Sequence, residues 1–140
     1  MKGVSKLTEV KKDQIVRAFY KTGAYIGQIT ELKESHAVVQ IKEVKKHPKQ
    51  GDLHHPNEVE VPLFHERKAL SFNERANIPL NMIKPYEEEP GDYFDSLKEA
   101  VAVLEEELES GASPFHKKSL EALNGVKREY ELMYSLNFTR

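Results

Sequence analysis

The sequence contains no cysteine. This absence excludes disulfide bonds, thiolate nucleophiles and cysteine-based zinc sites, and it suits a protein of the reducing cytosol. No stretch reaches the about 20 consecutive apolar residues that a transmembrane helix needs, and residues 1–12 lack the uninterrupted apolar run of a signal peptide. No repeat or low-complexity tract is visible. We therefore expect a cytoplasmic protein that at most lies peripherally at the inner face of a membrane.

The composition is that of an ordinary globular domain. The 140 residues are 39% hydrophobic and 31% charged, which is enough to bury a core. The net charge of -2 is unevenly spread, because residues 1–56 hold eleven Lys and Arg against six Asp and Glu, whereas residues 87–140 hold six against thirteen. Two interpretations follow: a nucleic-acid-binding face with an acidic tail, or two solvated faces that attract each other weakly, which we favour.

The first third of the chain has the pattern of β-strands. Residues 14–20 and 24–32 are rich in β-branched and aromatic side chains and are separated by a turn at residues 21–23. Residues 36–44 form a third such run after a polar turn. Gly27 lies inside the second run, where a glycine indicates a bulge or a tight bend. Three short antiparallel strands at this spacing favour a small barrel.

The middle of the chain is less regular. Prolines and a glycine exclude regular helix or a central strand from residues 46–56. Residues 58–64 alternate between polar and apolar and predict another strand. Over residues 65–77 we expect an irregular segment with a short helical turn.

Residues 77–86 are similar to the closing segment of SH3 domains, in which one 3₁₀ turn leads into the last barrel strand. Pro79 presets φ at the start of this turn, and Ile78 and Ile83 flank it. The resemblance implies an SH3-like barrel. Met82 stands where SH3 domains carry a tyrosine that grips proline-rich ligands, so we do not expect such ligands here.

The C-terminal third is periodic like helix. Asp92 and Ser113 are suited to cap the starts of two helices, and Gly111 ends the first. The apolar stripes of the two helices are Leu97, Val101, Leu104 and Leu108, and then Phe115, Leu120, Leu123, Val126, Tyr130 and Met133. The short connection forces an antiparallel hairpin. We therefore predict an α+β chain, with an SH3-like barrel over residues 1–88 and a helical hairpin over residues 89–140 packed on it.

Four of the six histidines lie in residues 46–56 and 64–70. A mixed nitrogen and oxygen metal site, or a metal-binding hydrolase, would draw on Asp52, His54, His55 and His65. The spacing matches no specific metal motif and no nucleophile elbow accompanies it. The alternative is a loop in which these side chains satisfy backbone groups.

A nucleic-acid-binding module is a further hypothesis. Lysines with nearby aromatic residues are suited to contact a nucleic-acid backbone and to stack on bases. The residues concerned are Lys45, Lys46, Lys49, Tyr20 and Tyr25.

Three segments, in this order, resemble the kinase-associated protein B (KapB) family of sporulating bacilli. They are residues 18–27, 46–56 and 64–70, with the sequences AFYKTGAYIG, KHPKQGDLHHP and FHERKAL. The resemblance runs from about residue 14 to 134 and implies an SH3-like barrel followed by helices. It also implies a role in activating the sensor histidine kinase KinB, which feeds phosphate into the phosphorelay that starts sporulation.

The family has been called a lipoprotein. A chain without cysteine cannot carry a diacylglycerol anchor, so we expect a protein partner to hold it at any membrane.

We therefore expect a non-enzymatic interaction module without a cofactor, whose partner is a KinB-like histidine kinase or its complex rather than nucleic acid. Polar and aromatic side chains gather on loops where barrels usually bind ligands. The candidate partner-binding residues are Lys46, His47, Gln50, Asp52, His54, Phe64, His65 and Arg67. Burial of the same side chains, which would lock the loop to the hairpin, is the competing interpretation.

Overall fold

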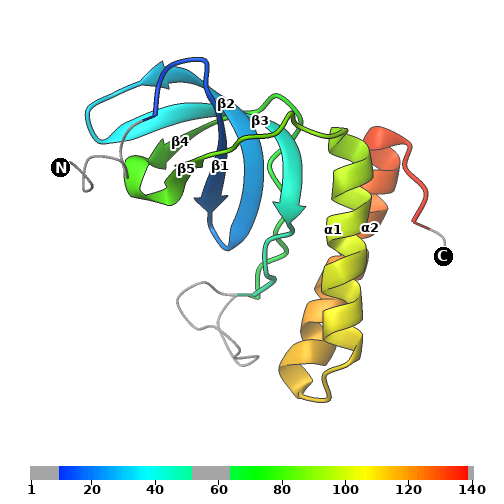
Figure 1. The fold of residues 1–140 in the computed structure, drawn as a ribbon. Helices are drawn as coiled ribbons and strands as arrows, with labels where there is room; N and C mark the ends of the chain where they lie inside the picture. Colours follow the sequence, from blue (N-terminus) through cyan, green and yellow to red (C-terminus); the bar gives the residue numbers. More distant parts are fainter. Residues whose placement is uncertain (1–9, 52–63, 139–140) are drawn as a thin grey trace.

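A computed structural model describes residues 10–51 and 64–138. Figure 1 shows a curved sheet with two helices side by side along its β3 flank. In chain order the elements are β1 Ile15–Tyr20, β2 Gly23–Leu32, β3 His36–Lys46, β4 Arg75–Pro79, the 3₁₀ helix η2 Leu80–Met82, β5 Ile83–Pro85, α1 Tyr93–Glu109 and α2 Pro114–Tyr134. The predicted α+β class is confirmed.

The strands form one antiparallel sheet in the order β4-β3-β2-β1-β5. The register between β2 and β3 shifts at three points, one of them between Ile26 and Gly27. The bulge predicted at Gly27 is therefore confirmed. Extra residues of this kind bend a strand and increase its twist, in keeping with the curl of β2 and β3 in Figure 1.

The sheet is open. In the described part of the chain, β4 and β5 are its two edges and no hydrogen-bonded ladder joins them. The predicted 3₁₀ turn followed by a short last strand is confirmed in η2 and β5. The closed SH3-like barrel is not confirmed, because β4 and β5 do not pair with each other.

The irregular segment predicted over residues 65–77 is confirmed up to Glu74, but the helical turn predicted within it is wrong. Residues 64–71 have no regular secondary structure and lead through a turn at residues 72–73 into β4. Their backbone groups bind side chains of other elements instead of each other: the Ala69 N–H donates to the Tyr130 hydroxyl at 2.7 Å, and the Leu70 N–H to the Tyr25 hydroxyl at 3.3 Å. Residues 58–63 of the strand predicted before them lie outside the described residues.

Both predicted helix caps are present. The Asp92 carboxylate accepts from the Asp95 N–H at 2.9 Å, and the Ser113 hydroxyl accepts from the His116 N–H at 3.2 Å. Caps of this kind satisfy amide groups that have no partner within the helix. They fix where α1 and α2 begin, and hence the antiparallel hairpin.

The start of α1 is attached to β3 by two polar contacts. The Val44 N–H donates to Ser96 Oγ at 2.9 Å, and the Gly91 N–H donates to Glu43 Oε1 at 2.9 Å. Glu43, 9% exposed, also pairs with Lys45 at 3.2 Å. These contacts orient the hairpin on the sheet.

Sheet and helices share one apolar core. Its fully buried members include Val16, Ile29, Val39, Ile41 and Ile78 from the sheet, and Leu97, Val101, Leu123, Val126 and Tyr130 from the hairpin. Met133, predicted for the second stripe, is instead 53% exposed. The helix ends one residue later, and Ser135, with φ of 56°, turns the chain so that Leu136 and Phe138 pack on the core.

Candidate functional site

The described parts of the two histidine-containing segments lie side by side. The Gly51 N–H donates to the His65 carbonyl at 2.9 Å, and the Arg67 N–H donates to Gln50 Oε1 at 2.9 Å. Gln50 Nε2 returns a bond to the Arg67 carbonyl at 3.0 Å, and Arg67 Nε donates to the Gly51 carbonyl at 3.2 Å. Residues 47–51 and 64–70 therefore form one paired unit below β3.

His47 ties this unit to the helical hairpin. Its Nε2 lies 2.8 Å from the Tyr130 hydroxyl, and its Nδ1 lies 3.0 Å from the Pro48 carbonyl. The hydroxyl already accepts the Ala69 N–H, so its own hydrogen is free to donate to Nε2. A carbonyl can only accept, so Nδ1 carries the ring hydrogen. All these groups are satisfied with His47 in its neutral form.

Burial keeps both partners neutral. His47 is 1% exposed, and burial lowers its pKa from 6.5 to about 4, although the hydrogen bond to Pro48 opposes the shift. Burial also raises the pKa of Tyr130, which therefore stays protonated. The penalty for burying the charged form explains both directions. The contact is a hydrogen bond between neutral groups rather than an ion pair.

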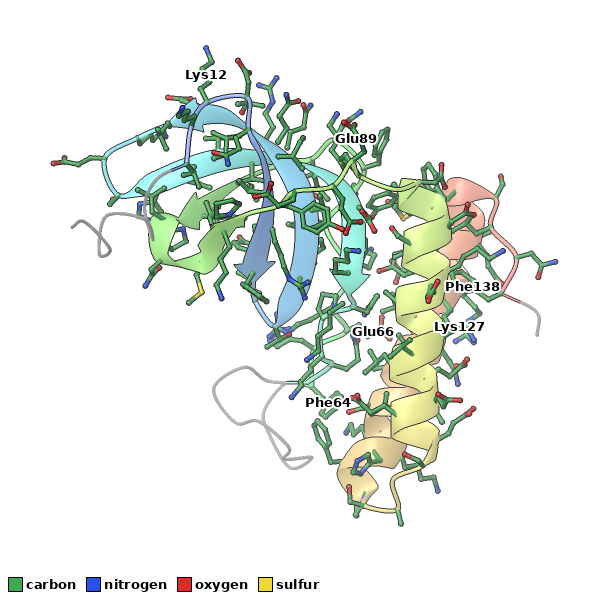
Figure 2. All side chains as sticks on the ribbon, in the orientation of Figure 1. Lys12, Phe64, Glu66, Glu89, Lys127 and Phe138 are labelled. Atoms are coloured by element: carbon green, nitrogen blue, oxygen red, sulfur yellow. The ribbon has the colours of Figure 1, made fainter. Side chains whose placement is uncertain are left out.

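Residues 64–70 also contact α2 along its length. The Phe64 ring lies 6.0 Å from the Phe115 ring, and Lys68 pairs with Glu129. The Glu66 carboxylate lies close against α2 at Gly125, since a Cβ atom there would be 2.7 Å from Glu66 Oε2. Figure 2 shows Phe64 and Glu66 between this segment and the hairpin. These contacts hold the paired unit against the helices.

The predicted partner-binding residues have different environments. His47 and Gln50 are buried, at 1% and 4% exposed, and their side chains stabilise the paired unit from inside. Lys46 is exposed, whereas Phe64, His65 and Arg67 are half-buried. Asp52 and His54 lie outside the described residues.

The residues of the two alternative hypotheses are also placed in part. For the metal site, Asp52, His54 and His55 lie outside the described residues and His65 is half-buried. Among residues 10–51 and 64–138, no group of three or more His, Cys, Asp or Glu is placed to hold a metal ion.

For nucleic acid, Lys45, Lys46 and Lys49 are exposed. Tyr25 is 1% exposed and its hydroxyl is bound within the fold, so it cannot stack on a base. The Tyr20 ring has the Lys21 ammonium over it, 5.2 Å from its centroid.

Sequence reasoning missed two hollows that lie on either side of the β1–β2 turn. One, of about 310 Å³, is bordered by Tyr20, Lys21, Tyr25, Pro48, Glu66, Arg67, Lys68, Leu70 and Glu74. The other, of about 390 Å³, is bordered by Phe19, Tyr20, Lys21, Thr22, Gly23, Ala24, Lys46, Pro79 and Met82. One signal for the second hollow was present in the sequence: Met82 is an apolar residue in a predicted turn. That Met82 and Phe19 line the same hollow depends on the fold and could not be predicted.

Within the described ranges, neither helix is long and apolar enough to cross a bilayer.

Comparison with known proteins gives a consistent result. The sequence model of the family "Kinase associated protein B" matches residues 20–131. The chain belongs to the kinase-associated protein B family. It is 50% identical over 116 residues to the "Kinase-associated lipoprotein B" of Bacillus subtilis (strain 168), a match that covers 83% of this chain and 91% of the relative.

A solved structure shares the fold. The crystal structure of kinase-associated protein B from Bacillus cereus matches with a TM-score of 0.74 and 37% identity, over 87% of this chain and 98% of that one. The names of these KapB proteins describe association with a kinase and mention no catalytic activity. The family resemblance seen in the sequence is confirmed.

Proposed function

We propose that this KapB-family protein is a non-enzymatic accessory protein of a KinB-like sensor histidine kinase, and that it promotes kinase activation in the phosphorelay that starts sporulation. The observation that carries the proposal is the 50% identity over 116 residues with a relative whose name describes kinase association. We infer that it acts in the cytoplasm and reaches the inner face of the membrane by binding the kinase.

The geometry supports a binding surface at the β1–β2 turn. Among the predicted partner-binding residues, Lys46 and Arg67 each border one of the two hollows there. His47 and Gln50 lie behind them and fix the backbone from which they project. We propose that Lys46 and Arg67 contact the kinase, with Phe64 and His65 at the margin, whereas the two buried residues position this surface.

Affinity capture from sporulating bacilli tests this proposal. The tagged protein should recover a sensor histidine kinase, identified by mass spectrometry, and a variant with Lys46→Glu and Arg67→Ala should recover much less of it. Circular dichroism must first show that the variant is folded. Lys98→Glu, which changes an exposed lysine of α1, is the matched control and should capture as the parent does. Recovery of nucleic acid or metal without any histidine kinase would contradict the proposal.

A further inference from the structure

We propose that the larger hollow beside the β1–β2 turn, called the turn groove below, binds an acidic peptide segment of the partner and accepts one large apolar side chain from it. The inference rests on the proposed accessory function and specifies the chemistry of the contact. The turn groove is the hollow of about 390 Å³ that is lined by residues 19–24, Lys46, Pro79 and Met82.

The turn groove has apolar walls that the protein leaves uncovered. Phe19 at the end of β1 is 37% exposed, and Met82 in η2 is 44% exposed. Both line the hollow together with Pro79 and Ala24. Large apolar side chains around a concavity are typical of pockets that receive a side chain of a ligand, and methionine adapts its shape to different occupants. The groove therefore suits an aliphatic or aromatic anchor.

The charge around this apolar surface has one sign. Of the described residues that line the groove, the charged ones are Lys21 and Lys46, and no carboxylate is among them. Arg17 extends the positive charge, because its guanidinium lies 5.4 Å from the centroid of the Phe19 ring. Lys84 of β5 is paired with Arg17 in the sheet. Electrostatic complementarity therefore favours a segment that carries Asp and Glu around its anchor.

The guanidinium of Arg17 has one unpaired donor atom. Its Nε atom is buried and has no hydrogen-bond partner in the described structure. Buried donors are normally paired. Because Nε is shielded from a ligand, an acidic segment bound along Phe19 would be attracted by the charge of the guanidinium rather than bonded to this atom.

The backbone of the turn is held in a conformation that its residues disfavour. Lys21 and Thr22 have φ of 46° and 69°, in the left-handed region, where Asn and Gly would be less strained. Thr22 Oγ1 accepts from the Lys49 N–H at 2.9 Å, which fixes the turn to the paired unit. Strained backbone of this kind concentrates at functional positions. Lys21 borders both hollows, and the fixed turn holds its backbone in place between them.

The shape favours a peptide over the other polyanions. A hollow that is walled by apolar side chains admits a protruding residue, whereas a flat bilayer cannot enter it. Binding of single-stranded nucleic acid relies on exposed rings for stacking, but Tyr25 is buried and Tyr20 has Lys21 over its ring. Anionic vesicles and RNA therefore serve as comparison ligands in the test.

The experiment uses the full chain and an array of nine-residue peptides. Each peptide has Phe, Leu or Trp at its centre and either glutamates, glutamines or lysines at the flanking positions, and matched peptides have Ser at the centre. We expect binding to acidic peptides with an apolar centre and loss of binding when either feature is removed. The dissociation constant of the best peptide, measured by fluorescence anisotropy, should rise about tenfold or more in Lys21→Glu with Lys46→Glu, and it should not change in Lys98→Glu.

Amide chemical shifts locate the bound peptide independently of these variants. Titration should move the signals of residues 19–24 and of Met82. The proposal is overturned by equal binding of acidic and basic peptides, by shifts elsewhere on the protein, by full binding in the charge-reversed variant, or by binding that only phosphatidylglycerol vesicles or poly(U) show.

The two proposals fail separately. If the kinase is captured equally well by the charge-reversed variant, the groove assignment is wrong and the accessory function stands. If acidic peptides bind the turn groove and no histidine kinase is captured, the accessory function is wrong and the groove stands.

Discussion

His47 Nε2 lies 2.8 Å from the hydroxyl of Tyr130, a residue 83 positions further along the chain. The same hydroxyl accepts the Ala69 N–H at 2.7 Å. One oxygen atom therefore joins the residue after β3, the irregular segment before β4 and the second helix. All three groups are buried, so the contact is shielded from water and its loss should be costly.

Replacing Tyr130 with Phe tests how much this junction stabilises the fold. The change removes one oxygen and leaves the Ala69 N–H and His47 Nε2 buried without partners. Leaving two buried polar groups unpaired costs about 2–4 kcal/mol of unfolding free energy. Urea denaturation followed by circular dichroism measures this loss.

The matched control for that substitution is Tyr134→Phe. The Tyr134 hydroxyl donates to Ser71 Oγ at 3.2 Å in a partly buried position, where water can replace the bond. We expect a loss below about 1 kcal/mol. A loss below about 1 kcal/mol for Tyr130→Phe as well would show that its hydroxyl contributes little to stability.

The stability should fall as the pH is lowered through the acid range because of His47. Its pKa is about 4 in the folded protein, against 6.5 for an unperturbed histidine. Between these pH values His47 binds a proton in the unfolded chain and stays neutral in the folded protein. The stabilisation is therefore complete above about pH 6.5 and decreases by about 1.4 kcal/mol per pH unit down to about pH 4, from this group alone.

Measuring the same pH dependence in the His47→Gln variant isolates the contribution of His47. Glutamine does not titrate, and all other titrating groups of the protein are the same in parent and variant. The difference in unfolding free energy between parent and variant should narrow as the pH falls from 6.5 to 4. A difference that stays constant over this range would mean that His47 is charged in the folded protein.

Gly27 and Gly91 should respond differently to the same substitution. A Cβ atom at Gly27 would lie 2.5 Å from the Gln40 carbonyl oxygen and 2.6 Å from Val39 Cγ1. The backbone of β3 is hydrogen-bonded in the sheet and cannot move away from this Cβ atom. Gly27→Ala should therefore lower the free energy of unfolding by about 1–3 kcal/mol. At Gly91 the nearest atom would be 3.5 Å away, and alanine there should change stability by less than about 0.5 kcal/mol. Thermal unfolding of both variants checks this, and equal melting temperatures would contradict it.

The local features of the fold could be predicted from the sequence. Asp92 and Ser113 cap helices because their side chains bind amides three residues ahead, and such a signal is contained in the sequence. The same is true of the turn after Pro79. The pairing of residues 47–51 with residues 64–70 was not predicted, because it depends on hydrogen bonds between Gln50, Gly51, His65 and Arg67 that no local pattern indicates.

The features that the sequence did not predict depend on distant partners. Nothing near His47 indicates that Tyr130 will bury it. The helical turn predicted after residue 64 is absent, and Gln50, Tyr25 and Tyr130 instead provide partners for the amides of this segment. Closure of the sheet depends on whether the edge strands β4 and β5 come close enough to pair. The alternation of polar and apolar residues does not contain this information. The turn groove brings β1, β3 and η2 together.

Sheet and hairpin should unfold together, in keeping with the predicted hairpin over residues 89–140 packed on residues 1–88. We expect this because both contribute to one core and the Glu43 and Ser96 side chains join them by hydrogen bonds. Tyrosine fluorescence and far-ultraviolet circular dichroism should then report the same urea midpoint. Two separate midpoints would show that the hairpin is an independent unit.

The central claim is that the protein binds a sensor histidine kinase and activates it. The most direct measurement is the autophosphorylation rate of a purified KinB-like kinase in detergent or nanodiscs, titrated with the purified protein. We predict a saturable increase in the rate, with the half-maximal concentration raised in the variant that carries Lys46→Glu and Arg67→Ala and unchanged in Lys98→Glu. A rate that does not respond at any concentration of the folded protein, together with no detectable binding, would contradict the account.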